Sequence, residues 1–185
     1  MGQARPLDDD FPGFSQEPQG SRCLVAGFNI DQSPQVRCWR KRGECTQAIG
    51  KSRGGRTTKI HALSDPDCRP YAFHLTPGQD SDIAAAPEVL ALAPPTRAVL
   101  ADKGYDGDAF RALIFKRGAR PVIPNKSNRV RLHRFNKRAY KGRNVIERCF
   151  CRLKDFRRIA TRYDKLARNF LASVHIAAIV AYWIN

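Results

Sequence analysis

The segment from residue 140 to 156 has two opposite helical faces, which restricts it to a helix packed on one side. Arg143, Glu147 and Lys154 follow Tyr140 by three, seven and fourteen positions. At about 100° of rotation per residue, all four fall within roughly 60° of one another. The apolar residues fall on the other side: Val145, Ile146, Cys149, Phe150, Leu153 and Phe156. We therefore expect this helix to bury its apolar face and to present the polar stripe to a groove.

The polar stripe has two interpretations. A carboxylate between two cations and a phenol suits a site that holds a divalent metal and guides phosphate groups past it. The alternative is a solvated helix face on which Arg143 and Glu147 form an ordinary i, i+4 ion pair. The stripe alone does not decide between them.

Three stretches of the sequence resemble one known family. The spacing Tyr-x2-Arg-x3-Glu-x6-Lys, starting at Tyr140, resembles the signature around the last acidic residue of the DDE transposases of bacterial insertion sequences. Residues 99–106 (Val-Leu-Ala-Asp-Lys-Gly-Tyr-Asp) look like the segment with that family's second catalytic aspartate, and residues 50–63 are similar to the stretch after the first. The resemblance covers residues 43–185 and leaves 1–42 as a poorly matching segment. It implies an α/β fold with an RNase H-like catalytic core and a helical C-terminus.

The resemblance also implies roles for individual residues. Asp102 and Glu147 are the expected catalytic residues and metal ligands, with Mg²⁺ as the cofactor and Mn²⁺ as a substitute. The implied reaction is cleavage and transfer of DNA strands, for which carboxylates from separate elements hold the metal. Contacts to double-stranded DNA are expected from one tyrosine and nine cations: Tyr140, Arg143, Lys154, Arg53, Arg56, Lys59, Arg134, Lys137, Arg138 and Lys141.

The first catalytic aspartate of this family is not evident. The nearest candidate for a catalytic residue and metal ligand is Asp31, which lies 71 positions before Asp102. A second hypothesis comes from the genetic code, because codons for residues 27–29 can be chosen so that a reading one base later gives Asp-Ser-Thr. In that case the stretch up to about Arg40 is translated out of the ancestral frame, and this copy has lost its first metal ligand and its cleavage activity.

The net charge of the chain indicates which class of partner it binds. The 185 residues carry 33 Lys and Arg against 17 Asp and Glu, a net charge of +16, so the surface attracts polyanions and nucleic acid is the expected partner. We expect no membrane span, no signal peptide and no structural zinc, because apolar runs are short and the six cysteines lack ligand spacing. The expected location is the bacterial cytoplasm, in association with the nucleoid.

The order of the expected elements is that of an α/β domain. Strands are predicted at 24–30, 57–63, 70–76, 97–101 and 121–123, and helices at 80–92 and 108–117. Pro87 is expected to kink or shorten the first helix, and Gly118 to close the second. Basic loops are predicted at 51–59 and 125–141. From residue 140 the chain is expected to be helical to near its end, with a break around 161–164.

Two other functions are compatible with the same residues. One is a basic nucleic-acid-binding protein without catalysis, in which Asp102 is a turn cap and Glu147 half of an ion pair. The other is a nuclease that acts on RNA–DNA hybrids. By analogy with the resembled family we also expect a homodimer on DNA.

Overall fold

The computed structural model describes residues 22–32, 47–52 and 55–184. Most of the predicted N-terminal segment 1–42 therefore lies outside the described residues. Arg53 also lies outside them. The strands are β1 (Arg22–Gln32), β2 (Gly50–Ser52), β3 (Gly55–Ser64), β4 (Pro70–Pro77), β5 (Ala98–Ala101), β6 (Arg120–Val122) and β7 (Thr161–Arg162). The helices are α1 (Asp82–Ala91), α2 (Asp108–Lys116), α3 (Lys137–Tyr140), α4 (Asn144–Lys154), α5 (Arg157–Ala160) and α6 (Ala167–Ile179).

The strands form one mixed sheet. Its order runs β2-β3-β1-β5-β6, with β4 also paired to β3 and β7 to β1. β1 and β4 run antiparallel to β3, whereas β5 runs parallel to both β1 and β6. In the register of β1 and β5, Val25 pairs with Ala101. Ala26 of β1 and Asp102, the residue that follows β5, therefore lie side by side.

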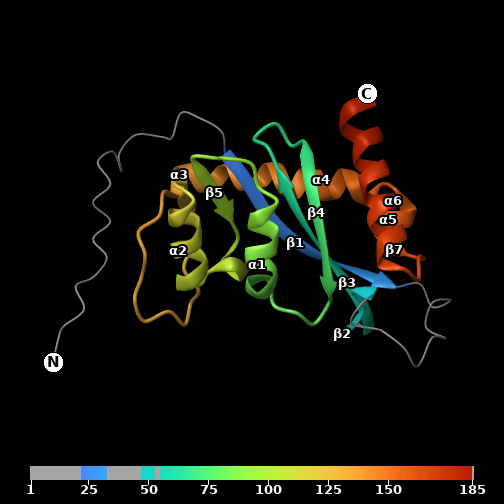
Figure 1. Ribbon diagram of the computed structural model, residues 1–185, viewed down its shortest axis with the longest axis horizontal. Helices are drawn as coiled ribbons and strands as arrows, with labels where there is room; N and C mark the ends of the chain where they lie inside the picture. The colour runs from blue at the N-terminus through green and yellow to red at the C-terminus, as the bar shows by residue number, and fades with distance from the viewer. Residues whose placement is uncertain (1–21, 33–46, 53–54, 185) are drawn as a thin grey trace.

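Helices cover both faces of the sheet, which gives three layers (Figure 1). On one face α1 and α2 pack through Val89, Leu90 and Ile114. On the other face α4 and α6 pack through Ile146, Leu153 and other apolar residues. The sheet supplies both cores because alternate side chains of a strand point to opposite faces. The expected α/β architecture with a helical C-terminus is thus present.

The predicted helices near the middle of the chain agree closely with the structure. α1 begins two residues later than predicted and continues through Pro87 to Ala91. Pro87 is the sixth residue of this helix, so its ring removes one intrahelical hydrogen bond without ending the helix. α2 ends at Lys116, and Gly118 follows it with a φ of +74°, the left-handed conformation that glycine adopts without steric cost.

The two predicted basic loops contain regular structure. β2 and the first half of β3 occupy the region 51–59, because Gly50 to Ser52 pair with Gly55 to Thr57 in a short hairpin. The end of the region 125–141 forms α3, whose N-terminus is capped by Asn136: the side-chain oxygen accepts hydrogen bonds from the N–H groups of Arg138 and Ala139. Basic composition alone did not show that these segments form a strand and a helix.

The C-terminal region is helical with the predicted break. The break contains β7, where Arg162 is fully buried. Its guanidinium donates to Thr58 Oγ1 at 2.6 Å and to the carbonyl oxygens of Ala48 and Asp164, and lies 5.0 Å from the ring centre of Phe170. Burial lowers the pKa of this guanidinium to about 10. Arg162 thus joins β7 and α6 to β3.

The last helical stretch differs from expectation in one respect. Residues Ala167–Ile184 are long and apolar enough to cross a bilayer by length and composition, although no such segment was expected. In the fold, Phe170, Val174 and Ala177 of this stretch pack into the core. A single segment of this kind is weak evidence for a span, because length and composition alone do not show that a membrane is crossed.

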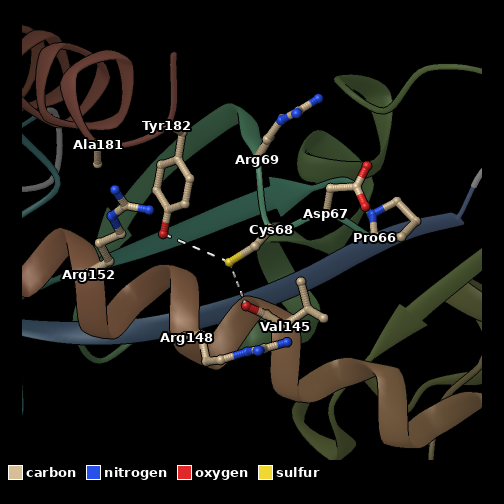
Figure 2. A pocket seen from close by; sticks show the side chains of 9 residues that line it. All are labelled: Pro66, Asp67, Cys68, Arg69, Val145, Arg148, Arg152, Ala181 and Tyr182. Atoms are coloured by element: carbon tan, nitrogen blue, oxygen red, sulfur yellow. Dashed lines mark hydrogen bonds between the residues drawn. The ribbon is translucent and has the colours of Figure 1, made fainter. Parts of the chain in front are cut away.

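The turn between β3 and β4 is joined to α4 by a cysteine. The Cys68 thiol donates a hydrogen bond to the Val145 carbonyl oxygen at 3.0 Å (Figure 2). Cys23, Cys68, Cys149 and Cys151 are free thiols. Burial raises the pKa of the Cys23 thiol to about 11 and that of Cys149 to about 12. Both thiols therefore stay protonated in the core.

Replacement of Arg162 by Met should destabilise the fold. The substitution leaves the Ala48 and Asp164 carbonyls and the Thr58 hydroxyl without this donor in a buried place, so we expect a loss of about 3 kcal/mol. Urea unfolding followed by circular dichroism measures it. The control is Arg158→Met, which removes an exposed guanidinium paired with Asp164 and should leave the unfolding midpoint unchanged. Equal midpoints for the two variants would contradict the role given to Arg162.

Candidate functional site

Asp102 lies at the end of β5, where the chain turns into a single 3₁₀ turn over Lys103–Tyr105. Its Oδ1 accepts a hydrogen bond from the Gly104 N–H at 2.9 Å. Partial burial raises the pKa of Asp102 above its usual range, and the nearby Asp82 carboxylate raises it further. The bond from Gly104 offsets only part of this rise. Asp102 is therefore a turn cap, as the alternative interpretation held, but one whose charge is destabilised by its surroundings.

The neighbour of Asp102 is a second carboxylate, which the sequence analysis did not identify. A Cβ atom at Gly104 would lie 2.4 Å from Asp82 Oδ2 and 2.9 Å from Asp102 Oδ1. The two oxygens therefore converge on one point from α1 and from β5. A side chain at residue 104 would displace one or both carboxylates, so glycine at this position permits their close approach.

Lys59 belongs to the same cluster. Its Nζ lies 2.9 Å from Asp82 Oδ1 and donates to the Asp80 carbonyl oxygen at 2.7 Å. The Asp82 contact is an ion pair by distance but lacks the alignment of a hydrogen bond. The Lys59 side chain is 11% exposed. This corrects its expected role as a DNA contact, because the amine is committed to an internal ion pair.

The polar stripe forms as predicted around Glu147. Arg143 donates to Glu147 Oε1 at 2.6 Å and lies 5.5 Å from the ring centre of Tyr140. Both the carboxylate and the phenol are accessible, with Glu147 51% exposed. Lys154 lies on the same helix seven residues beyond Glu147, about 10 Å along its axis. Three members of the stripe are therefore in direct contact, and the fourth is farther along α4.

Tyr140 connects the stripe to Asp102. Partial burial raises the pKa of its phenol; Arg143 lowers it, and the carboxylates of Asp102 and Glu147 raise it further. Arg143 in turn partly offsets the rise in the pKa of Asp102. Electrostatic coupling of this kind requires proximity. Asp102 and Glu147, 45 residues apart in sequence, thus both act electrostatically on the same tyrosine.

The strand register does not bring Asp31 to this place. Ala26 is the residue of β1 beside Asp102, and Asp31 lies five residues farther along, about 16 Å at the usual rise of a strand. At that end β1 pairs Asp31 with Thr57 of β3 and with Thr161 of β7. Carboxylates that share a pair of metal ions about 4 Å apart must be much closer than this. The backbone position of Asp31 is therefore unsuited to its expected role as first ligand.

The two carboxylates that remain as candidate ligands, Asp102 and Glu147, suit a metal that needs few protein ligands. Within the described residues, no group of three or more His, Cys, Asp or Glu side chains could hold a metal ion. Mg²⁺ commonly uses one or two carboxylates together with water and substrate phosphates. The raised pKa of Asp102 also fits, because a cation there would offset repulsion from Asp82.

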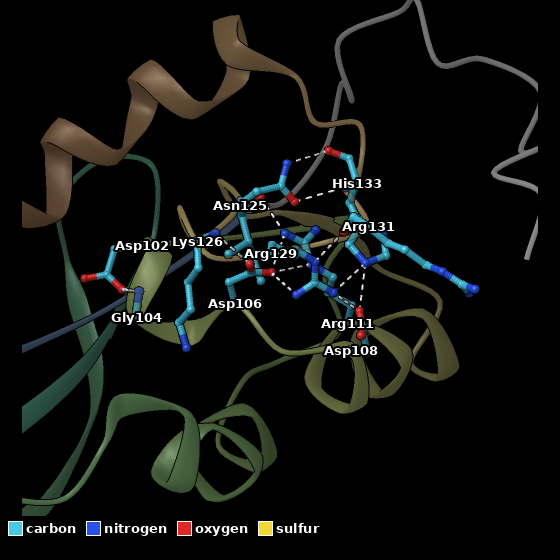
Figure 3. A network of polar contacts seen from close by, with 11 residues as sticks. Asp102, Gly104, Asp106, Asp108, Arg111, Asn125, Lys126, Arg129, Arg131 and His133 are labelled. Carbon is cyan, nitrogen blue, oxygen red and sulfur yellow. Dashed lines mark hydrogen bonds and ion pairs between the residues drawn. The ribbon is translucent and has the colours of Figure 1, made fainter. Parts of the chain in front are cut away.

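The basic loop after β6 is held in place by acidic residues (Figure 3). Arg129 binds both Asp106 and Asp108, and His133 lies 2.8 Å from Asp108. Burial would raise the pKa of Asp106, but the Lys126 N–H, Arg111 and Arg129 hold it below its usual range. The carboxylate is thus ionised and ties the loop to the turn that follows Asp102.

Four of the expected DNA contacts form an exposed group beside Tyr140. Arg134, Lys137, Arg138 and Lys141 are all exposed. Arg56 is half-buried near the start of β3, at the end of the sheet where Asp31 pairs, and so belongs to another part of the surface. Arg53 lies outside the described residues. The candidate site thus has cations on the side of α3.

A buried histidine, which no sequence pattern indicated, supports the turn through Tyr105. His61 is fully buried, with Nδ1 2.6 Å from Tyr105 Oη and Nε2 2.9 Å from Thr76 Oγ1. Burial lowers the pKa of this imidazole to about 4. The side chain that ends the 3₁₀ turn after Asp102 is thereby fixed to β3. Only the pairing of distant segments reveals the contact.

Comparison with known proteins points to one family. Residues 34–183 match the family model described as the Transposase DDE domain. A protein of Brucella ovis, provisionally named a transposase for insertion sequence element IS6501, is 36% identical over 122 residues, which are 65% of this chain and 94% of that protein. A Burkholderia cepacia protein, provisionally named a transposase for insertion sequence element IS402, is 27% identical over 137 residues, 68% of this chain and 63% of that protein. The chain thus spans under two thirds of the second relative.

His61 should make the fold sensitive to mild acid. Its pKa is near 6.5 in an unfolded chain and about 4 in the fold, so the unfolded state binds more protons between these values. Its contribution is complete above pH 6.5 and decreases as the pH falls towards 4, by about 3 kcal/mol in all. Urea unfolding at pH 7, 6, 5 and 4 measures this slope.

The matched variants are His61→Gln and His175→Gln. The first should flatten the dependence between pH 6.5 and 4, because no imidazole remains to take up a proton in the core. The second removes an exposed histidine and should keep the slope of the unmodified chain. A slope that survives His61→Gln would contradict the assignment.

Proposed function

Because the chain belongs to the family of transposases with a DDE domain, we propose that it binds insertion-sequence DNA and a divalent metal at Asp102 and Glu147 for strand cleavage and transfer. The observation that supports the proposal is that both carboxylates, Asp102 after β5 and Glu147 on α4, act electrostatically on Tyr140, whose ring lies beside Arg143. A solvated helix face has no reason to approach a carboxylate at the end of a buried strand. The proposal thus favours the functional interpretation of the polar stripe.

The topology supports an RNase H-like core. Three antiparallel strands, β4, β3 and β1, are followed across the sheet by parallel β5 and β6, with helices on both faces. In the resembled family the second aspartate follows the fourth strand of this core and the glutamate lies on a later helix. Asp102 directly follows β5, which is the fourth strand of this core when the short strand β2 is not counted. Glu147 lies on the later helix α4.

In the proposed reaction the residues of this chain hold the reactants. Asp102 and Glu147 would bind Mg²⁺, which when present stabilises charge on the entering and leaving oxygens of the phosphodiester. Arg143 lies between Glu147 and Tyr140 and can turn its guanidinium to a backbone phosphate. Tyr140 would hydrogen-bond the same backbone or stack on a base, and Lys154 would hold a phosphate farther along α4.

The cations beside Tyr140 would hold the double-stranded DNA. Arg134, Lys137, Arg138 and Lys141 lie on or next to α3, at the side of the site where Tyr140 emerges. Contacts of this kind read no sequence but give affinity that falls steeply with salt. The expected homodimer on DNA stays a prediction.

We further propose that this copy lacks the first metal ligand. The residue of β1 beside Asp102 is Ala26, and Gly27 follows it, where the hypothesis of a shifted reading frame puts the ancestral aspartate. The same observation supports the second candidate function, a DNA-binding protein that retains the fold and part of the metal site but does not cleave.

Asp102→Asn should separate a metal ligand from a structural cap. The amide oxygen can still accept from the Gly104 N–H, and the repulsion from Asp82 disappears. We therefore expect an unchanged or higher free energy of unfolding together with a loss of Mn²⁺ binding in calorimetry. Glu147→Gln should also abolish Mn²⁺ binding, whereas Glu88→Gln, an exposed acid on α1, should not. Retained binding in both site variants would refute the metal site and favour the non-catalytic alternative.

Two substitutions in β1 test the missing ligand. Gly27→Asp should increase Mn²⁺ affinity by about tenfold, the effect of about 1.4 kcal/mol, and should allow Mg²⁺-dependent nicking of DNA that carries the terminal repeats. Asp31→Ala should leave metal binding as it is. If Asp31→Ala instead removes it and Gly27→Asp adds nothing, Asp31 is the first ligand after all.

A further inference from the structure

A pocket lies on the other flank of α4 from Glu147. Its volume is about 550 Å³. The turn between β3 and β4, α4, and the last helical turn over Val180–Ile184 line it. In Figure 2 the Arg152 side chain and the Tyr182 ring border one end, and Pro66 and Asp67 the other. Residues distant in sequence thus form a cavity that the proposed active site does not include.

The lining of the pocket is strongly cationic. Arg69, Arg148 and Arg152 face a single acid, Asp67. In the part of the chain that the structure describes, none of these three guanidinium groups forms an ion pair. Arg129, Arg143 and Arg158, in contrast, each bind a carboxylate. The positive charge of the pocket is therefore available to a ligand.

Aromatic rings hold two of these arginines. The Arg152 guanidinium lies 4.9 Å from the ring centre of Tyr182, and that of Arg69 lies 5.7 Å from the ring centre of Trp183. Such contacts orient the planar group without neutralising it. An oriented guanidinium loses less side-chain entropy when it binds and can offer two parallel N–H groups to one phosphate.

The pocket is separate from the proposed reaction centre. Arg148 and Arg152 lie one and five residues after Glu147, which is a rotation of about 100° and 140° around α4. Ile146, Cys149 and Leu153 face the core, so α4 exposes both flanks, with Glu147 on one and the arginines on the other. A ligand in the pocket therefore does not compete with a metal at Glu147.

We propose that this pocket binds a backbone phosphate of double-stranded DNA, as a contact in addition to those beside Tyr140. The proposal rests on the proposed function, since it supposes that DNA is the partner. Unpaired arginines in a fork geometry select phosphate or carboxylate, and the net charge of +16 favours a polyanion. Arg148 and Arg152 supply the charge, and the ring of Tyr182 fixes the orientation.

The test is duplex binding by fluorescence anisotropy at several KCl concentrations, with EDTA present so that no metal contributes. Arg148→Gln with Arg152→Gln should weaken binding about tenfold at 0.1 M KCl. It should also reduce the slope of log affinity against log salt by about two, one for each lost phosphate contact. Arg148→Lys with Arg152→Lys keeps the charge but loses the fork, and should weaken binding less.

The matched control is Lys116→Gln with Arg168→Gln, which removes the same charge from exposed positions on α2 and α6 and should change affinity no more than about twofold. If the pocket variant binds DNA like this control, the proposal is overturned, and the pocket suits an acidic protein segment instead. If the unmodified chain binds no duplex at all, the proposed function fails. Loss of metal binding in Asp102→Asn bears on neither result, so the two failures are distinguishable.

Discussion

Repulsion between two carboxylates at the end of β5 is the constraint around which this site is arranged. Asp82 and Asp102 converge over Gly104 in a partly buried place, where the Asp82 carboxylate disfavours the charge of Asp102. Lys59 offsets part of this repulsion through its ion pair with Asp82, and the neutral His61 holds Tyr105 beneath the turn. An arrangement that keeps two acids together at a cost in stability is typical of a site prepared for a cation. It would be a poor solution for a turn that only had to cap β5.

Part of the candidate site could be predicted from the sequence. The stripe from Tyr140 to Lys154 follows from helical periodicity, whereas Asp102 was expected from the resemblance of residues 99–106 to the DDE transposases. The role of Asp82 could not be predicted, because it depends on how α1 packs against β5, twenty residues away in sequence. The sequence indicated only that the segment around Asp82 begins the helix predicted at 80–92.

The errors have a physical cause in common, which is that charge in a sequence does not show where the charge lies. Residues 57–64 of β3 are all buried, since strands and helices surround them. Lys59 is therefore internal, although its basic neighbours suggested a phosphate contact. Arg129 belongs to a basic loop but is bound to Asp106 and Asp108. The net charge correctly indicated a polyanion as the partner, but only the ion pairs show which cations can reach it.

The proposed loss of the first metal ligand concerns a side chain, whereas the fold depends on the backbone pairing of β1. β1 is held in the centre of the sheet by backbone pairing with β3 and β5, and these hydrogen bonds place few demands on side chains beyond an apolar character at core positions. Loss of an acid at residue 27 would remove a metal ligand but no backbone bond and no core contact. It would also remove negative charge from a crowded acidic site. A copy that has lost cleavage in this way has no reason to lose its fold, and the arginines on both flanks of α4 would continue to hold DNA.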